Sequence, residues 1–120
     1  MPSAAMLVIG NEILSGKVVD TNSPYLAKEL RALGVELERI LTIPDEIDLI
    51  ASEVKAMSEA HDYVFTSGGI GPTHDDITAD AVAAAFGLAV IEHPEAVARL
   101  EANYASRGME FTPARRRMTR

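Results

Sequence analysis

The segment TSGGIGPTHDDIT, residues 66–78, combines glycines with acidic side chains directly after an apolar run. Gly68, Gly69 and Gly71 lack Cβ atoms, so the backbone there can turn sharply and present N–H groups to an anion. A helix is expected to begin near Thr78, and the positive end of its dipole would favour the same anion. These features are typical of a phosphate or pyrophosphate site, although a plain tight turn would use the same glycines.

The same segment carries negative charge. Asp75 and Asp76 are adjacent, and Asp80 follows one helical turn later. Carboxylates repel a neighbouring anion unless a divalent cation bridges the two or one carboxylate acts on the ligand. The simpler alternative is that both aspartates only stabilise the N-terminus of the following helix. His74 would either contact phosphate or face solvent.

Apolar runs and helical periodicities predict the elements that position this segment. Gly10–Asp20 is expected to be a loop. Strands are expected at Ala4–Ile9, Val35–Ile43 and Asp62–Thr66, with a short edge strand at Leu88–Ile91. The expected helix N-caps are Ser23, Asp45 and Thr78, and the expected ends of the first and third helices are Gly34 and Gly87. A further helix is expected at Pro94–Ser106, with Val97, Leu100 and Tyr104 facing inward.

This alternation of strands and helices predicts the α/β class, as a three-layer α/β/α sandwich with a mostly parallel sheet. Ligands of such folds bind beyond the carboxyl ends of the strands. Three loops lie there, at residues 10–20, 43–46 and 67–78. We therefore expect Asp20 and Asp45 to meet the glycine-containing loop at one edge of the sheet, although each could instead serve only as a helix cap.

Composition restricts the class of protein. The 120 residues suit a single domain, and the net charge of −7 argues against nucleic acid as a partner. No apolar stretch is long enough for a membrane helix, and the N-terminal residues lack the pattern of a secretion signal, so a cytoplasmic protein is expected. Cysteine is absent, which excludes a disulfide framework and thiolate chemistry.

The C-terminal residues predict a helix that begins at Thr112 and Pro113 and is then cut short. We therefore expect a domain of residues 1–120 that is truncated at its C-terminus or completed by a partner. The run also carries four cations that either meet phosphate or form the solvated start of the helix: Arg115, Arg116, Arg117 and Arg120.

Three motifs together carry a resemblance that covers nearly the whole chain. They are GNEILSGKVVDTN (residues 10–22), IPDE (residues 43–46) and TSGGIGPTHDDITADAVAAAFG (residues 66–87). In this combination the sequence resembles the MoaB/Mog molybdopterin-binding domain family, and within it the CinA type. It is also similar to the molybdopterin-binding-like region of FAD synthases.

The resemblance implies site residues and ligands. It places the phosphate of molybdopterin or of a nucleotide at Thr66, Ser67, Gly68, Gly69 and Gly71. It assigns Asp45 and Asp76 as catalytic residues and as metal ligands. Mg²⁺ or another divalent cation is implied as a cofactor, and a homodimer or homotrimer as the assembly. Asn11 stands where the family often has aspartate, which argues against catalysis at that position. The resemblance implies Asp20 as a supporting residue, and the local pattern of charge adds Asp75 and His74.

Three functions remain open from the sequence. The first is binding of a phosphorylated pterin or nucleotide at the glycine-containing loop. The second is metal-dependent hydrolysis of a nucleotide pyrophosphate bond, of the ADP-ribose or FAD type, which the resemblance associates with the CinA type. The third is an oligomerisation scaffold without activity. Both ligand classes offer an anion to the same loop, so the residues do not decide between pterin and dinucleotide.

Overall fold

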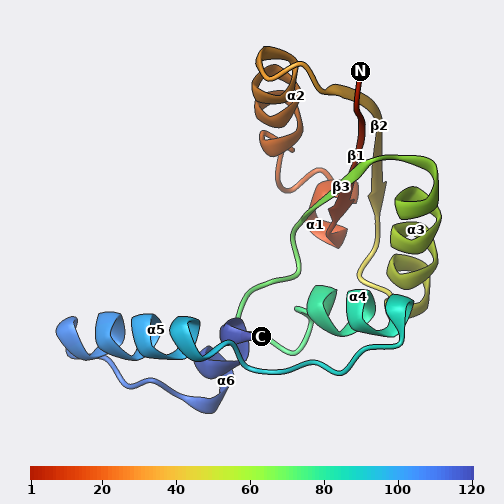
Figure 1. Cartoon of the computed structure of the whole chain (residues 1–120). Helices are drawn as coiled ribbons and strands as arrows, with labels where there is room; N and C mark the ends of the chain where they lie inside the picture. The colour runs from red at the N-terminus through yellow and green to blue at the C-terminus, as the bar shows by residue number, and fades with distance from the viewer.

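The computed structural model describes all 120 residues and has the predicted α/β fold (Figure 1). Its sheet has three parallel strands in the order β2-β1-β3. The strands are β1 (Ser3–Ile9), β2 (Glu36–Ile43) and β3 (Tyr63–Ser67). The helices are α1 (Asn11–Leu14), α2 (Asn22–Ala32), α3 (Ile47–Ala60), α4 (Thr78–Phe86), α5 (Pro94–Ser106) and α6 (Pro113–Arg116), followed by the 3₁₀ turn η1 (Arg117–Thr119).

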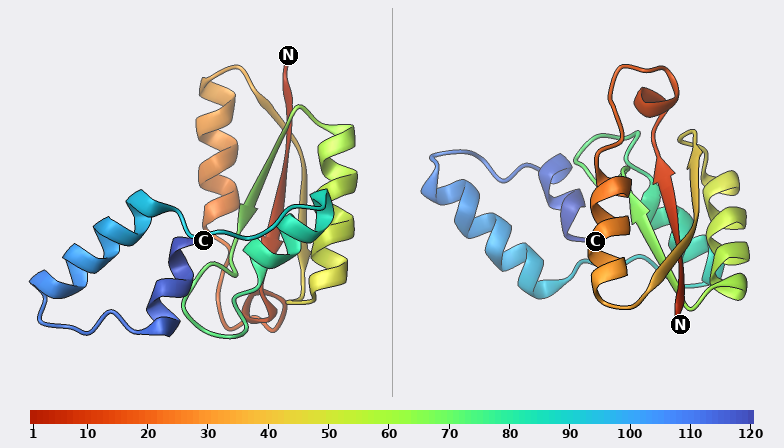
Figure 2. Two further views of the ribbon diagram at one scale, coloured as in Figure 1. Left: turned by 60° about the horizontal axis from the view of Figure 1, so that its bottom comes forward. Right: turned by 90° about the horizontal axis from the view of Figure 1, so that it is seen from above.

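Helices α2 and α3 cover opposite faces of the sheet (Figure 2). The chain leaves the central strand β1 toward β2 and then crosses back over β1 to reach β3. Because both crossovers are expected to be right-handed and run in opposite directions, they place their helices on opposite faces. The carboxyl ends of β1 and β3 therefore lie at the point where the strand order reverses, which is where ligands of open α/β sheets bind.

The core lies between the sheet and α3. Leu7 and Ile9 of β1 are fully buried, and they pack in one cluster with Ile50 and Met57 of α3. Ala81 brings α4 into the same cluster. Burial of each large apolar side chain stabilises the folded state by about 1.5–3 kcal/mol. The packing of this cluster therefore holds the end of β1 in place against α3 and α4.

The predicted N-caps of α2, α3 and α4 are wrong in the structure, whereas Thr112 caps α6 as predicted and accepts the Arg115 N–H at 3.2 Å. Helix α2 begins one residue before Ser23, whose N–H donates to Asp20 Oδ1 at 3.1 Å. Helix α3 has Glu46 as its N-cap, because the Asp45 carboxylate accepts a hydrogen bond from a different loop. Thr78 is the first residue of α4 rather than its cap. The predicted helix ends near Gly34 and Gly87 are confirmed.

Two further segments differ from the sequence prediction. The predicted loop at residues 10–20 contains the short helix α1, and no strand forms at residues 88–91. Leu88 and Ile91 are largely exposed, because the chain after α4 leaves the sheet and finds no strand to pair with.

Helix α5 has its predicted bounds but not its predicted environment. It extends away from the sheet together with α6 (Figure 1), and none of its residues is buried. Val97, Leu100 and Tyr104 are only half-buried, so their predicted inward orientation is wrong with respect to the main core. Tyr104 instead stacks on Phe111, with ring centroids 5.8 Å apart. None of the helices has both the length and the apolar composition needed to cross a bilayer.

Candidate functional site

Residues 68–71 directly follow β3 and begin the connection to α4. We call these four residues the glycine turn. Gly68 has a φ of 95° and Gly69 a φ of 69°, a region that favours glycine. A Cβ atom on Gly68 would overlap the carbonyl oxygen of Ile9 in β1. A Cβ atom on Gly69 would overlap the hydroxyl oxygen of Thr78. The turn therefore lies so close to the end of the central strand that only glycine fits at both positions.

The glycine turn is fixed through its carbonyl groups, which leaves amides free. Thr78 donates its hydroxyl to the Gly68 carbonyl at 2.8 Å and its N–H to the Gly69 carbonyl at 3.1 Å. The N–H groups of Gly69 and Ile70 donate to no protein acceptor. Unpaired amides in a rigid turn are the donors that bind anions in phosphate sites.

Asp76 closes the loop that follows the glycine turn. Its Oδ2 accepts the N–H of Thr73 at 2.9 Å and the Thr73 hydroxyl at 2.8 Å. Burial by itself would raise the pKa of Asp76, but the two Thr73 donors, the Gly71 N–H and the charge of Arg117 outweigh it and lower the pKa. The carboxylate is therefore fully ionised at neutral pH and is available as a hydrogen-bond acceptor.

A reciprocal pair joins the loops that follow β1 and β2. Asn11 N–H donates to Asp45 Oδ2, and Asp45 N–H donates to Asn11 Oδ1, both at 3.2 Å. An aspartate at position 11 would place two carboxylates side by side, whereas asparagine accepts the same hydrogen bond without a charge. Asn11 thus positions Asp45.

These loops surround one cavity of about 470 Å³. Asp45 from the loop after β2, Gly69 from the glycine turn, and Asp75 and Asp76 from the loop before α4 all line it. The other lining residues are Asn11, Glu12, Ser15, Lys17 and Thr73. We call this cavity the carboxylate cavity. Four carboxylates and one ammonium group line it, so it favours hydrogen-bond donors of a ligand over anionic groups.

The remaining predicted site residues lie outside the carboxylate cavity. The Asp20 carboxylate accepts the N–H of Ser23 at the start of α2. Thr66 and Ser67 line a different cavity of about 210 Å³ beside α2, where Ser67 Oγ accepts from Asn22 Nδ2 at 2.9 Å. His74 is 92% exposed and lies 3.2 Å from Asp75. The strand topology predicted Asp20 at this edge, and the family resemblance implied Thr66 and Ser67, but none of the three lines the carboxylate cavity.

The donor set does not suit a metal ion held by the protein alone. Asp45 and Asp76 line the same cavity, but no three His, Asp or Glu side chains lie close enough together to ligate one ion. Mg²⁺ and Ca²⁺ take six or more oxygen ligands, which include waters and phosphate oxygens as well as carboxylates. Asp45 and Asp76 alone therefore do not make a complete ligand set, and a divalent cation at these two residues stays a prediction.

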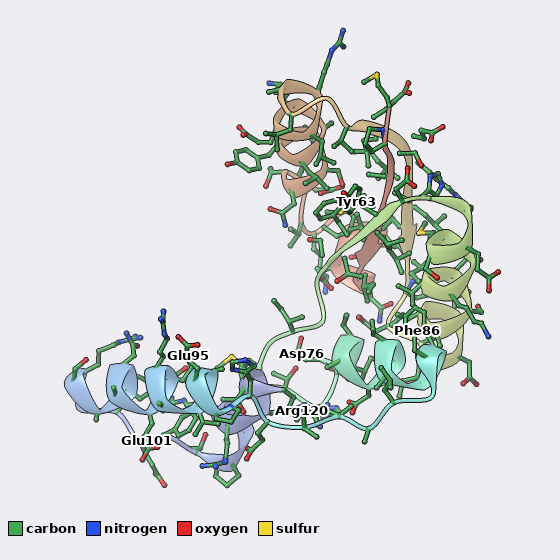
Figure 3. All side chains as sticks on the ribbon, in the orientation of Figure 1. Tyr63, Asp76, Phe86, Glu95, Glu101 and Arg120 are labelled. Atoms are coloured by element: carbon green, nitrogen blue, oxygen red, sulfur yellow. The ribbon has the colours of Figure 1, made fainter.

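The C-terminal arginines contact this loop, which the sequence did not predict. Arg117 Nη2 donates to the backbone carbonyl of Asp76 at 2.8 Å, and both Arg117 and Arg120 contact Asp80 Oδ2, at 3.5 and 3.2 Å. Figure 3 shows Asp76 and Arg120 near the junction of α4 with the C-terminal segment. The run of arginines is visible in the sequence, but its contacts with Asp76 and Asp80 depend on the path of the folded chain.

Comparison with known proteins shows which family this chain belongs to. Residues 5–117 match the family model described as a probable molybdopterin binding domain. A protein of Aeropyrum pernix is 41% identical over 118 residues, which cover 98% of this chain and 44% of the relative. A probable FAD synthase of Caenorhabditis briggsae is 54% identical over 84 residues, which cover 70% of this chain and 16% of the relative.

Two solved structures superpose on this chain and share its fold. The protein CinA from Thermoplasma acidophilum superposes with a TM-score of 0.88 at 32% identity, over 98% of this chain and 68% of that one. The molybdopterin biosynthesis enzyme MoaB from Thermus thermophilus has a TM-score of 0.64 at 23% identity, over 85% and 64% of the two chains, which shows a shared fold alone. The chain spans less than half the length of the curated relatives that it matches.

Proposed function

Because the chain belongs to the family of probable molybdopterin-binding domains, in the MoaB/Mog group and its CinA type, we propose that it binds a phosphorylated pterin or nucleotide at the glycine turn. The observation that supports this most strongly is the pair of unpaired amides at Gly69 and Ile70. They lie in a turn whose carbonyl groups are held by Thr78, so they are preorganised donors for a phosphate oxygen.

The carboxylate cavity would take the part of the ligand that carries hydrogen-bond donors. Asp45 and Asp76 both line it beside Gly69, and the lowered pKa of Asp76 keeps that carboxylate ionised. Amino and N–H groups of a pterin, or hydroxyl groups of a ribose, are suitable donors to such acceptors. In this arrangement the phosphate contacts backbone amides, while the uncharged donors of the ligand contact carboxylates.

Hydrolysis of a nucleotide pyrophosphate bond is the second candidate. An ionised carboxylate at Asp76 lies beside free amides that could stabilise charge developing on a phosphate, and Asp45 could orient the attacking water. However, a carboxylate whose pKa is lowered is a weaker base than an ordinary aspartate. This observation favours binding over hydrolysis.

Self-association is the third candidate and stays a prediction. Phe86 at the end of α4, together with Leu88 and Ile91 in the segment that follows, forms an exposed apolar stretch. A homodimer or homotrimer, the assembly predicted from the family, would be compatible with ligand binding and does not compete with it.

A thermal-shift series tests the proposed binding. We expect molybdopterin or at least one of AMP, ADP-ribose and FAD to raise the unfolding temperature, because a ligand present at 100 times its Kd adds about 2.7 kcal/mol to the stability. Each ligand is measured with and without Mg²⁺, so that a cation carried by the phosphates is detected. Adenosine is the control for AMP, since it lacks the phosphate and should give no shift. Equal shifts with adenosine and AMP, or none with any ligand, would contradict the proposal.

A further inference from the structure

The 3₁₀ turn η1 near the C-terminus is anchored at the start of α5. Thr119 is 1% exposed, and its backbone carbonyl accepts the His93 N–H at 2.7 Å. Its hydroxyl donates to the Arg116 carbonyl, also at 2.7 Å. A buried residue with both polar groups paired holds the backbone around it in one conformation. Arg117, the first residue of η1, therefore extends from a fixed turn.

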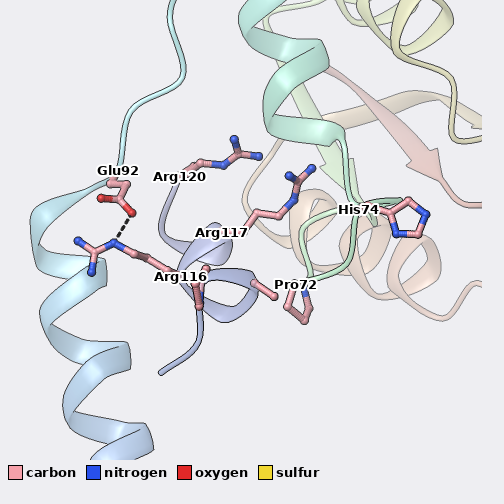
Figure 4. A pocket seen from close by; sticks show the side chains of 8 residues that line it. Pro72, His74, Glu92, Arg116, Arg117 and Arg120 are labelled. Atoms are coloured by element: carbon pink, nitrogen blue, oxygen red, sulfur yellow. Dashed lines mark hydrogen bonds and ion pairs between the residues drawn. The ribbon is translucent and has the colours of Figure 1, made fainter. Parts of the chain in front are cut away.

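Arg117 contacts the loop that carries Asp76. Its Nη2 donates to the Asp76 carbonyl at 2.8 Å and lies 3.5 Å from Asp80 Oδ2 in the first turn of α4. Arg120 lies 3.2 Å from the same Asp80 oxygen. Figure 4 shows Arg117 extending toward this loop, while Arg116 extends in another direction. The C-terminal segment thus holds the loop and the start of α4 together.

Asp76 is held on two sides by these contacts. Its carboxylate accepts the N–H and the hydroxyl of Thr73, while its carbonyl accepts the charge-assisted hydrogen bond from Arg117. The carboxylate also lies against the glycine turn, since a Cβ atom on Gly71 would be 2.7 Å from Asp76 Oδ2. In this position the carboxylate lines the carboxylate cavity. Release of the carbonyl would leave only the contacts within the loop.

We infer that Arg117 is a positioning residue, which holds the Asp76 carbonyl and thereby directs the Asp76 carboxylate toward the ligand. This inference rests on the proposed function and adds that the affinity depends on a residue 41 positions away from Asp76. Asp76 would accept hydroxyl or amino groups of the ligand, whereas the phosphate contacts the amides of Gly69 and Ile70. Those amides belong to a turn that Thr78 holds, so they do not depend on Arg117.

Replacing Arg117 with methionine separates positioning from folding. Arg117→Met keeps an apolar stem for packing, because the Arg117 side chain is only 28% exposed, and it leaves Asp80 paired with Arg120. Arg117→Lys keeps the positive charge and a donor for the Asp76 carbonyl. Arg116→Met is the matched control, since Arg116 is adjacent and pairs with Glu92 at an exposed site, where an ion pair contributes little to folding.

Calorimetry with AMP and inorganic phosphate tests the inference. We expect the unsubstituted protein to bind AMP more tightly than phosphate. Arg117→Met should weaken AMP binding about tenfold, as expected for a weakened hydrogen bond to a charged group, and leave phosphate binding unchanged. Arg117→Lys should restore most of the AMP affinity, and Arg116→Met should change neither ligand. Without ligand, Arg117→Met should also shift the amide NMR signal of Thr73, which donates to Asp76 Oδ2.

Four outcomes would overturn the positioning role. Three of them leave the proposed function standing: unchanged AMP affinity in Arg117→Met, equal losses of AMP and phosphate affinity in that variant, and phosphate binding without tighter AMP binding in the unsubstituted protein. Equal losses would mean that Arg117 acts on the phosphate itself or on the fold as a whole. The fourth outcome, no binding of AMP or phosphate to the unsubstituted protein, would overturn the proposed function as well.

Discussion

Replacing Gly68 with alanine is expected to destabilise the protein by at least about 3 kcal/mol. The residue has a φ of 95°, which side-chain-bearing residues rarely adopt, and the added Cβ atom would overlap the carbonyl oxygen of Ile9. That carbonyl belongs to the buried central strand and cannot shift without disturbing the sheet. Since a domain is stable by only about 5–15 kcal/mol, the loss should be plain in urea unfolding followed by circular dichroism.

Gly16→Ala is the matched control for this substitution. Gly16 has a similar φ of 81°, but a Cβ atom there would meet no atom within 4 Å. The control therefore carries the conformational cost alone, about 1–2 kcal/mol, without the overlap. If both variants lost the same stability, the close approach of the glycine turn to β1 would not be a requirement of the fold.

Replacing Asp45 with alanine is expected to lower the affinity for the ligand, and this is the second large effect. The Asp45 carboxylate lines the same cavity as Gly69 and accepts the Asn11 N–H, so its removal would delete a ligand acceptor and loosen the loop after β1. A hydrogen bond to a charged group is worth about 1.5–3 kcal/mol, which corresponds to a loss of roughly 10- to 150-fold in affinity. Calorimetric titration with the ligand found by thermal shift measures it.

Asp48→Ala serves as the control for Asp45→Ala. Asp48 is an exposed carboxylate in the first turn of α3, three residues farther along the chain, and it does not line the cavity. Its substitution removes the same charge and should leave the affinity nearly unchanged. Equal losses in the two variants would mean that Asp45 acts only through net charge, and no loss in either would remove it from the site.

The main elements could be predicted from the sequence because local patterns determine them. The apolar run around Leu7 predicts a buried strand, the spacing of Ile50, Val54 and Met57 predicts the buried face of α3, and Pro94 marks the first residue of α5. The topology followed from the order of these elements. It was sufficient to bring the loops after β1, β2 and β3 to one end of the sheet.

The N-caps of α3 and α4 could not be predicted, because distant partners compete for the same polar groups. Asp45 has the composition and position of an N-cap, yet its carboxylate accepts the N–H of Asn11, a residue 34 positions earlier. Thr78 likewise uses its hydroxyl on Gly68, ten positions earlier, instead of on its own helix. No local pattern distinguishes a side chain that caps its own helix from one that bonds to a distant loop.

The site itself was predictable only in part. The glycine turn and Asp76 belong to one continuous motif, and the structure keeps them together with Asp45. Asp20 lies in the same predicted loop group, but its carboxylate accepts the Ser23 N–H at the start of α2. The contact of Arg117 with the Asp76 carbonyl joins residues 41 positions apart, so it required the path of the chain through α5.

The most direct test of one shared site is an amide NMR titration with AMP, with adenosine as the control. If the loops after β1 and β3 bind the same ligand, the amide signals of Gly69, Ile70, Thr73 and Asn11 should shift together with a single affinity, while those of Val97 and Leu100 on α5 stay unchanged. Adenosine should leave the signals of Gly69 and Ile70 in place. Signals that move on α5 but not in the glycine turn, or turn signals that move equally with adenosine, would contradict a phosphate site built on these amides.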